Sequence, residues 1–305
     1  MTKRLKHIKR FTPLYVMMLP GLLYLLINNY LPMAGIVTAF KDIDYRKGIF
    51  GSDWIGFKNF EYLFATQDAF IITRNTICYN IAFIIINTTL SVVVAILLSE
   101  MAAKKAKRFY QSAILLPYLL SMVIIGYLVN ALLNTELGFV NNSLLAPLGI
   151  DPVQWYMEPK LWVFILPTVY AWKEVGYLSI IYYSAVLGIV RNTTRQLLWR
   201  GASKFQQIRF ITLPLIKPVI YTMVLLSIGK IFRSDFGLFY HVPLNTGTLY
   251  STTNVIDTYV YRGLMQLGDI GMSSAAGAYQ AVVGFIFVLI SNLIVKKTSP
   301  ENALF

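Results

Sequence analysis

The chain has 305 residues, of which 56% are hydrophobic and only 13% are charged, whereas roughly a quarter are charged in a soluble domain. Its mean hydropathy is +0.59, and the apolar residues gather in runs of about twenty, the length that crosses a bilayer. These values exclude an ordinary soluble globular protein. The net charge of +13 does not point to nucleic acid, because the basic residues follow the ends of the apolar runs.

Six apolar runs predict an all-α polytopic membrane protein that forms a single transmembrane domain over residues 1–305. The predicted spans cover about 13–38, 75–98, 112–133, 161–189, 219–235 and 275–295. The first span follows a basic N-terminal segment and is too long for the apolar region of a cleavable signal peptide. After it, an aromatic-rich loop of residues 41–64 is expected to fold as a small amphipathic element at the outer interface.

Lysine and arginine residues predict the orientation of the spans. The N-terminus, the stretch after Glu100, the segment 191–218 and the C-terminal tail hold 17 of the 27 Lys and Arg residues. The loops on the other side hold most of the acids. By the positive-inside rule both termini lie in the cytoplasm, which agrees with an even number of spans. The third outer loop, residues 236–274, has room for a re-entrant or interfacial helix.

The longest polar stretch between two apolar runs lies within residues 191–218, between the fourth and fifth spans. From Arg195 to Pro218 it holds five Lys and Arg residues and no acid. The pattern predicts a short helix, a turn at Gly201, a second amphipathic helix through about Phe210 and a stop at Pro214. Two interpretations fit this hairpin: its apolar face binds a soluble partner, or it lies on anionic lipid.

Several polar side chains fall inside the predicted spans, where such groups usually face the bundle interior or a water-filled path. Asn80 and Asn87 are seven residues apart and share a helix face, which fits either hydrogen-bonded helix packing or a path lining. Glu174 can pair with Lys230 or Arg233 across two spans. The candidate path comprises Asn80, Asn87, Glu174, Tyr177, Lys230, Arg233 and Asp235.

The sequence predicts no catalytic centre, no metal site and no cofactor bound by this chain. Its two histidines, His7 and His241, fall on opposite sides of the membrane in this topology, so they cannot share a metal ion. No phosphate-binding loop of the Gly-x-x-x-x-Gly-Lys-Ser/Thr type is present. The single cysteine, Cys78, excludes an intrachain disulfide.

The segment Gly201-Ala202-Ser203, followed by Ile211-Thr212-Leu213-Pro214-Leu215, resembles the cytoplasmic coupling loop of permease subunits in binding-protein-dependent ABC importers. In that family the loop opens on Glu-Ala-Ala and Asp-Gly-Ala and ends on Ile-Thr-Leu-Pro. Here Arg195 stands in place of the glutamate and Arg200 in place of the aspartate. Residues 48–64, 235–272 and 300–305 extend the resemblance over nearly the whole chain, to the oligosaccharide and polysaccharide branch.

The resemblance implies a type I importer permease of the cell membrane that carries an oligosaccharide or polysaccharide fragment by alternating access. Its expected partners are a second permease subunit, two ATP-binding cassette subunits that hold ATP and Mg²⁺, and an extracytoplasmic solute-binding protein. Gly201 would form the turn of the coupling loop, Ala202 and Ser203 would pack against the ATPase, and Pro214 would end the element. The polar path residues, beside rings such as Tyr177, would meet sugar hydroxyls.

Two other functions stay open. An ion-coupled secondary transporter would need an inverted repeat or broken helices with intramembrane acids. A permease-like membrane scaffold would carry the fold without working ATPase coupling, because Arg195 and Arg200 replace two acids of the coupling loop.

Overall fold

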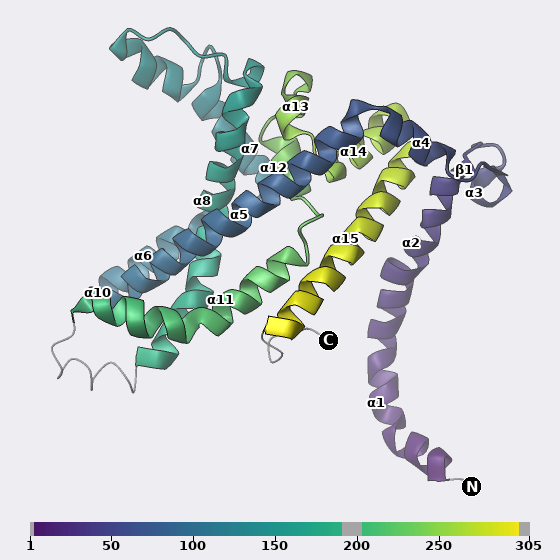
Figure 1. The fold of residues 1–305 in the computed structure, drawn as a ribbon, viewed down its shortest axis with the longest axis horizontal. Helices are drawn as coiled ribbons and strands as arrows, with labels where there is room; N and C mark the ends of the chain where they lie inside the picture. Colours follow the sequence, from purple (N-terminus) through teal and green to yellow (C-terminus); the bar gives the residue numbers. More distant parts are fainter. Residues whose placement is uncertain (1–2, 191–202, 299–305) are drawn as a thin grey trace. The chain divides into compact units, whose positions relative to one another are not determined.

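The computed structural model describes residues 3–190 and 203–298 and falls into two compact units. Unit 1 comprises residues 1–66 and 260–279, and unit 2 comprises residues 67–259 and 280–305. Figure 1 shows a chain that is almost entirely helical in its described parts, with one two-stranded sheet. The prediction of a polytopic α-helical membrane protein is therefore confirmed.

Unit 1 begins with one long helical run. It consists of α1 (Lys3–Leu25), a π-helical turn (Leu26–Tyr30), α2 (Leu31–Met33) and a 3-10 helix (Ala34–Phe40). Strands β1 (Lys41–Asp42) and β2 (Asp53–Trp54) then pair antiparallel around α3 (Gly48–Gly51), and α4 (Lys58–Ala65) follows. The small core of this unit packs Ala39 against Ala275 and Ala278, with Phe40 and Phe60 around them.

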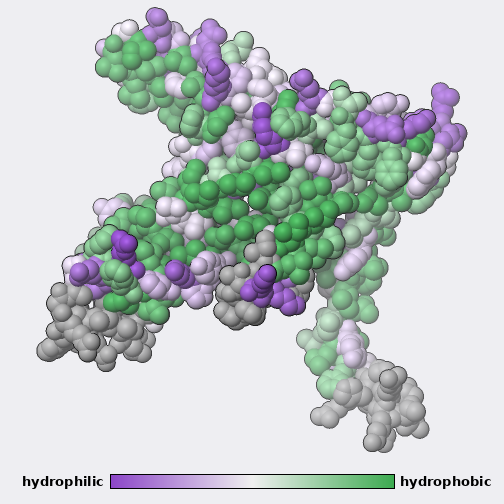
Figure 2. Space-filling view, in the orientation of Figure 1, coloured by the Kyte–Doolittle hydropathy of each residue, from purple (hydrophilic) through white to green (hydrophobic). Residues whose placement is uncertain are grey.

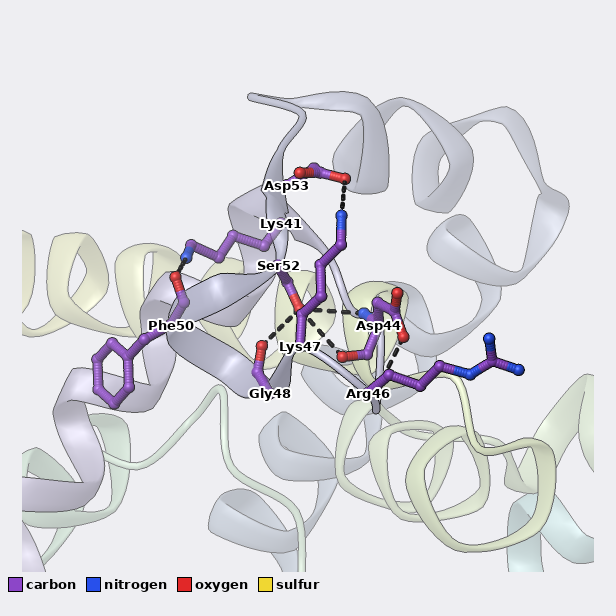
Figure 3. Close-up of polar contacts among 8 residues, drawn as sticks. All are labelled: Lys41, Asp44, Arg46, Lys47, Gly48, Phe50, Ser52 and Asp53. Carbon is purple, nitrogen blue, oxygen red and sulfur yellow. Dashed lines mark hydrogen bonds and ion pairs between the residues drawn. The ribbon is translucent and has the colours of Figure 1, made fainter.

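Polar contacts fix the loop between β1 and β2 (Figure 3). The buried ammonium of Lys41 donates to the carbonyl oxygens of Ile49 and Phe50, at 3.0 and 2.9 Å. The hydroxyl of Ser52 donates to the carbonyl oxygen of Gly48 at 2.6 Å. The predicted small folded element is thus present, and it leaves the ring of Phe50 exposed. Its placement at the outer interface stays a prediction.

Unit 2 is built on two long helices, α5 (Gln67–Glu100) and α8 (Pro159–Val190), which pack against each other. Helix α6 (Lys104–Leu119) also packs on α8 and is followed by α7 (Met122–Leu133). Short helical segments, Val140–Leu145, Ala146–Leu148 and Trp155–Met157, lead to α8. One core cluster of the unit is centred on Tyr79, Phe83, Trp162 and Phe239, and a second includes Val92, Tyr182 and Ile216.

The second half of the chain opens with α10 (Lys204–Gln207), a π-helical turn (Ile208–Thr212) and α11 (Leu213–Ile228). It continues with α12 (Phe236–His241), a 3-10 turn (Gly247–Leu249), α13 (Tyr250–Thr253) and α14 (Ile256–Arg262). A π-helical turn (Gly263–Leu267) leads to α15 (Ile270–Thr298). Helices α12, α13 and α14 occupy the loop in which the sequence left room for a further helix.

Four helices in the described part of the chain are long and apolar enough to cross a membrane: Phe11–Phe40, Gln67–Glu100, Lys204–Ile228 and Ile270–Lys297. Helices α6 and α7 make a fifth if the pair, which is bent by 97°, is one span. Figure 2 shows hydrophobic residues along the long helices and hydrophilic residues gathered near helix ends. Helix α8, the predicted fourth span, is 32 residues long and carries Lys173 and Glu174 near its middle. The count of six spans stays a prediction.

Two boundaries predicted from the sequence are wrong. The helix after Ser203 does not stop at Pro214, because α10, the π-helical turn and α11 form one run over Lys204–Ile228. Pro214 lies in the first turn of α11, where the missing N–H is tolerated after the π-helical turn. The predicted fifth span also ends early, at Ile228, so residues 229–235 lie beyond the helix.

The bend between α6 and α7 is held by Lys173 of α8. This residue is only 8% exposed, and its Nζ donates to the carbonyl oxygens of Tyr118 at 3.1 Å and Leu120 at 2.6 Å. A helix end leaves carbonyl groups without intrahelical partners, and a buried ammonium needs acceptors. The ammonium group of Lys173 therefore provides the hydrogen-bond donor that the two carbonyl oxygens lack, and they provide its acceptors. In this way Lys173 fixes where α6 ends.

Gly176 brings α6 and α8 into close contact less than one turn further along α8. A Cβ atom at this position would lie 1.8 Å from the carbonyl oxygen of Ile114. No side chain fits this distance, so the packing of the two helices requires glycine here.

Replacing Lys173 with methionine is expected to destabilise the protein by about 2–4 kcal/mol, because buried carbonyl acceptors lose their donor. The matched control is Lys160→Met, since Lys160 lies on the same helix and is exposed. Thermal unfolding of the purified protein in detergent would measure both. Equal melting temperatures for the two variants would contradict the role given to Lys173.

The variants Gly176→Ala and Gly188→Ala are expected to have opposite effects. The new methyl group meets backbone atoms at Gly176, whereas nothing lies within 4 Å of it at Gly188. Gly188→Ala should therefore stabilise α8 by up to about 1 kcal/mol through helix propensity, and Gly176→Ala should destabilise it. Melting temperatures in the same detergent test this, and a stabilising Gly176→Ala would refute the close contact.

Candidate functional site

Two helix breaks lie side by side in unit 2. One separates α6 from α7 at residues 120–121, and the other separates α11 from α12 at residues 229–235. The first turns of α7 and α12 touch, because a Cβ atom on Gly237 would lie 2.8 Å from the Cβ atom of Met122. Broken helices of this kind expose backbone groups where a membrane protein lines a cavity or binds a solute.

Side chains cap the helix that follows each break. The hydroxyl of Ser121 accepts from the N–H of Ile124, at 3.4 Å. A carboxylate oxygen of Asp235 accepts from the N–H of Leu238, at 3.0 Å. Asp235, a predicted path residue, therefore has a structural role as the N-cap of α12.

The second break is also held by Asp257 of α14 and Gln280 of α15. The carboxylate of Asp257 accepts from the N–H of Ser234 at 2.7 Å and from Nε2 of Gln280 at 3.1 Å. The same Nε2 donates to the carbonyl oxygen of Phe232 at 2.7 Å. Neither Asp257 nor Gln280 belongs to the predicted path. Gln280 could have been found as an amide in an otherwise apolar or aromatic run, whereas Asp257 lies among other polar residues and gave no such signal.

The two asparagines of the predicted path have different environments. Nδ2 of Asn80 donates to the carbonyl oxygen of Arg233 at 3.2 Å and to that of Thr76 at 2.8 Å, so Asn80 ties α5 to the second break. Asn87 is 5% exposed, and its Oδ1 has no hydrogen-bond partner among the described residues. The shared helix face therefore does not give the two side chains the same role.

Glu174 and Tyr177 lie on α8 near the first break. Glu174 is half-buried and directly follows Lys173 on the helix. The exposed ring of Tyr177 stacks on that of Tyr118, with ring centres 4.5 Å apart and planes 8° apart. Both residues are therefore placed beside the bend that Lys173 holds.

The predicted ion pair between Glu174 and Lys230 or Arg233 is wrong. The structure forms no such contact within 4.0 Å in the described part of the chain, where the ion pairs are those of Lys47 with Asp53 and Lys204 with Glu100. Lys230 and Arg233 lie beyond the end of α11, and both side chains are exposed. The second break thus presents two cations that are available to a ligand.

Of the predicted coupling residues, Ser203 and Pro214 lie within the described part of the chain, and Arg195, Arg200, Gly201 and Ala202 lie outside it. Ser203 caps α10: its hydroxyl accepts from the N–H of Gln206, whose Oε1 accepts from the N–H of Ser203 at 2.9 Å. The next residue, Lys204, forms an ion pair with Glu100 at the end of α5. The Ser203 cap therefore sets where α10 begins, and the ion pair between Lys204 and Glu100 connects α10 to the end of α5.

The described residues contain no group of three or more His, Cys, Asp or Glu side chains that could hold a metal ion. Unit 2 contains a pair of helix breaks, the two exposed cations Lys230 and Arg233, and aromatic rings.

No family model matches the chain. The chain is 33% identical over 291 residues to the polygalacturonan/rhamnogalacturonan transport system permease protein YteP of Bacillus subtilis (strain 168). The match covers 95% of this chain and 89% of that protein.

Solved structures show the same relationship. The crystal structure of a bacterial ABC transporter involved in the import of the acidic polysaccharide alginate matches with a TM-score of 0.89 and 30% identity, over 98% of this chain and 100% of that one. A second match is the crystal structure of the bacterial alginate ABC transporter in complex with an alginate pentasaccharide-bound periplasmic protein. Its TM-score is 0.86 and its sequence identity 30%, over 96% of this chain and 97% of that one. These relationships show that the chain belongs to the permease subunits of sugar ABC transporters.

Proposed function

We propose that this chain forms one half of the transmembrane pathway of an ABC importer whose substrate is an acidic oligosaccharide. The observation that carries the proposal is the match, over nearly the full length, to a transporter of acidic alginate. The polygalacturonan relative also has an acidic sugar polymer in its name. Lys230 and Arg233, both exposed beyond the end of α11, supply the charge that a carboxylate substrate needs.

The proposed assembly comprises a second permease subunit, two ATP-binding cassette subunits with ATP and Mg²⁺, and an extracytoplasmic solute-binding protein. Both termini lie in the cytoplasm, and six spans cross the membrane. Alternating access would move the two helix breaks relative to the partner permease.

Residues 191–218 are proposed to couple this chain to the ATPase. Phe205 and Phe210 support the proposal, because these residues are 68% and 69% exposed on the helical run that starts at Lys204. An exposed pair of large aromatic rings fits a cleft of a partner protein. The replacement of two acids by Arg195 and Arg200 instead favours a second candidate function, a permease-like scaffold with impaired coupling. The comparisons give no support to an ion-coupled secondary transporter.

The substrate proposal is tested with the importer reconstituted in proteoliposomes, with trigalacturonate and neutral maltotriose as probes. ATP-dependent import of trigalacturonate is expected. Arg233→Gln should raise the KM for this probe roughly tenfold, because a charge-assisted hydrogen bond is lost. Lys160→Gln is the matched control on an exposed lysine. Equal KM values for Arg233→Gln and wild type would contradict a role for this cation, and import of maltotriose alone would contradict an acidic substrate.

The coupling proposal is tested by ATPase activity of the reconstituted complex, with and without the binding protein and sugar. The natural chain is expected to stimulate hydrolysis as well as a variant with Arg195→Glu and Arg200→Asp, because a matched partner would carry acids opposite the two arginines. Stimulation by the double variant alone would instead identify the natural chain as the scaffold.

A further inference from the structure

We propose that a pocket between α7 and the turn after α12 is a subsite for one pyranose ring of the transported oligosaccharide. The inference rests on the proposed function and adds a second place at which the sugar binds. The pocket has a volume of about 310 Å³ and is lined by residues that include Tyr127, Tyr240, His241 and Asn245. Ligand pockets start at roughly 300 Å³, so this one holds a single ring rather than an oligomer.

Aromatic rings form the wall of this pocket. Tyr127 projects from α7 and is 68% exposed. Across from it on α12, the planes of Tyr240 and His241 are nearly perpendicular, with ring centres 5.2 Å apart. One face of a pyranose carries axial C–H groups that pack on an aromatic ring. An exposed tyrosine beside a half-buried tyrosine therefore offers the apolar surface that a sugar face needs.

Polar atoms lie at the same place. The imidazole of His241 makes no hydrogen bond within the described part of the chain, although its ring contacts Phe236 and Tyr240. Oδ1 of Asn245 accepts from the hydroxyl of Tyr250 at 3.2 Å, which fixes the orientation of its amide. Tyrosine, histidine and amide groups provide both donors and acceptors, as sugar hydroxyls require.

The backbone around the pocket is held in an unusual conformation. Leu244 and Asn245 have φ angles of 55° and 48°, and they are the two non-glycine residues with positive φ in the described part of the chain. For leucine this conformation is unfavourable, and strain of this kind gathers at binding sites. On the opposite wall, a Cβ atom at Gly126 would lie 2.7 Å from the carbonyl oxygen of His241. The two walls of the pocket are therefore in direct contact at this point.

One wall of the pocket belongs to α12, the helix that directly follows the second helix break. Asp235 caps α12, and the next residue, Phe236, stacks on Tyr240 with ring centres 5.0 Å apart and planes 18° apart. A strip of rings therefore runs along α12 from the break to the pocket. A chain of sugar rings that meets Lys230 and Arg233 at the break would reach the pocket with a ring further along.

The test measures the KM for import of galacturonate oligomers of two and three rings by the reconstituted complex. Tyr127→Ala is expected to raise the KM for the trimer roughly three- to tenfold, the size of an aromatic contact. The increase in KM should be smaller for the dimer, because a shorter substrate cannot contact the second helix break and fill the pocket at the same time. Tyr127→Phe keeps the aromatic ring, so its KM for the trimer should stay closer to the wild-type value. Tyr240→Ala provides a second, independent variant.

The matched control is Tyr110→Ala, since Tyr110 is an exposed tyrosine of α6 outside the pocket. A KM equal to wild type for both Tyr127→Ala and Tyr240→Ala would overturn the subsite and leave the proposed function intact. An increase that is the same for dimer and trimer would also overturn it, because it indicates a general structural effect. If the wild-type complex imports neither galacturonate oligomers nor maltotriose, the proposed function fails, and the subsite with it.

Discussion

The interaction on which unit 2 depends is the contact between the buried ammonium of Lys173 and the carbonyl groups at the end of α6. In apolar surroundings every backbone polar group needs a partner, so a helix cannot simply stop there. Lys173 supplies the donor that makes the bend possible. Asp257 and Gln280 do the same for the second break, where they bind backbone groups of residues 232 and 234. Both breaks are possible because side chains from other helices form hydrogen bonds with the backbone groups that the breaks leave unpaired.

The position of the candidate site follows from these contacts. Because α6 ends where Lys173 reaches it, α7 starts against α12, and glycines at positions 126 and 237 allow the two helices to touch. Of the polar path residues, Lys230, Arg233 and Asp235 lie in the second break, whereas Asn80 and Asn87 lie within α5 and Glu174 lies within α8. This placement leaves Lys230 and Arg233 exposed and gives the aromatic residues of α12 a fixed direction.

The sequence predicted the helical class and most of the long apolar helices, because runs of apolar residues are a dense local signal. It did not predict the breaks, because their partners are far along the chain: Lys173 lies 53 residues from Leu120. The stop at Pro214 was wrong because a π-helical turn accommodates the proline. The ion pair of Glu174 was wrong for a related reason, since the expected partners lie beyond the helix end. Pro214 shows that a residue type gives only a tendency, which the neighbouring hydrogen bonds can override.

The place of Lys173 also has a consequence for biogenesis. If α8 is the fourth span predicted from the sequence, the charge of Lys173 near its middle would oppose its insertion into a bilayer by roughly 3 kcal/mol. The carbonyl groups that receive the ammonium belong to residues 118 and 120, which are synthesised first. Helix α8 would therefore enter the membrane as a partner of the α6–α7 bend rather than as an independent unit. The same bond that shapes the candidate site would set the order in which the helices assemble.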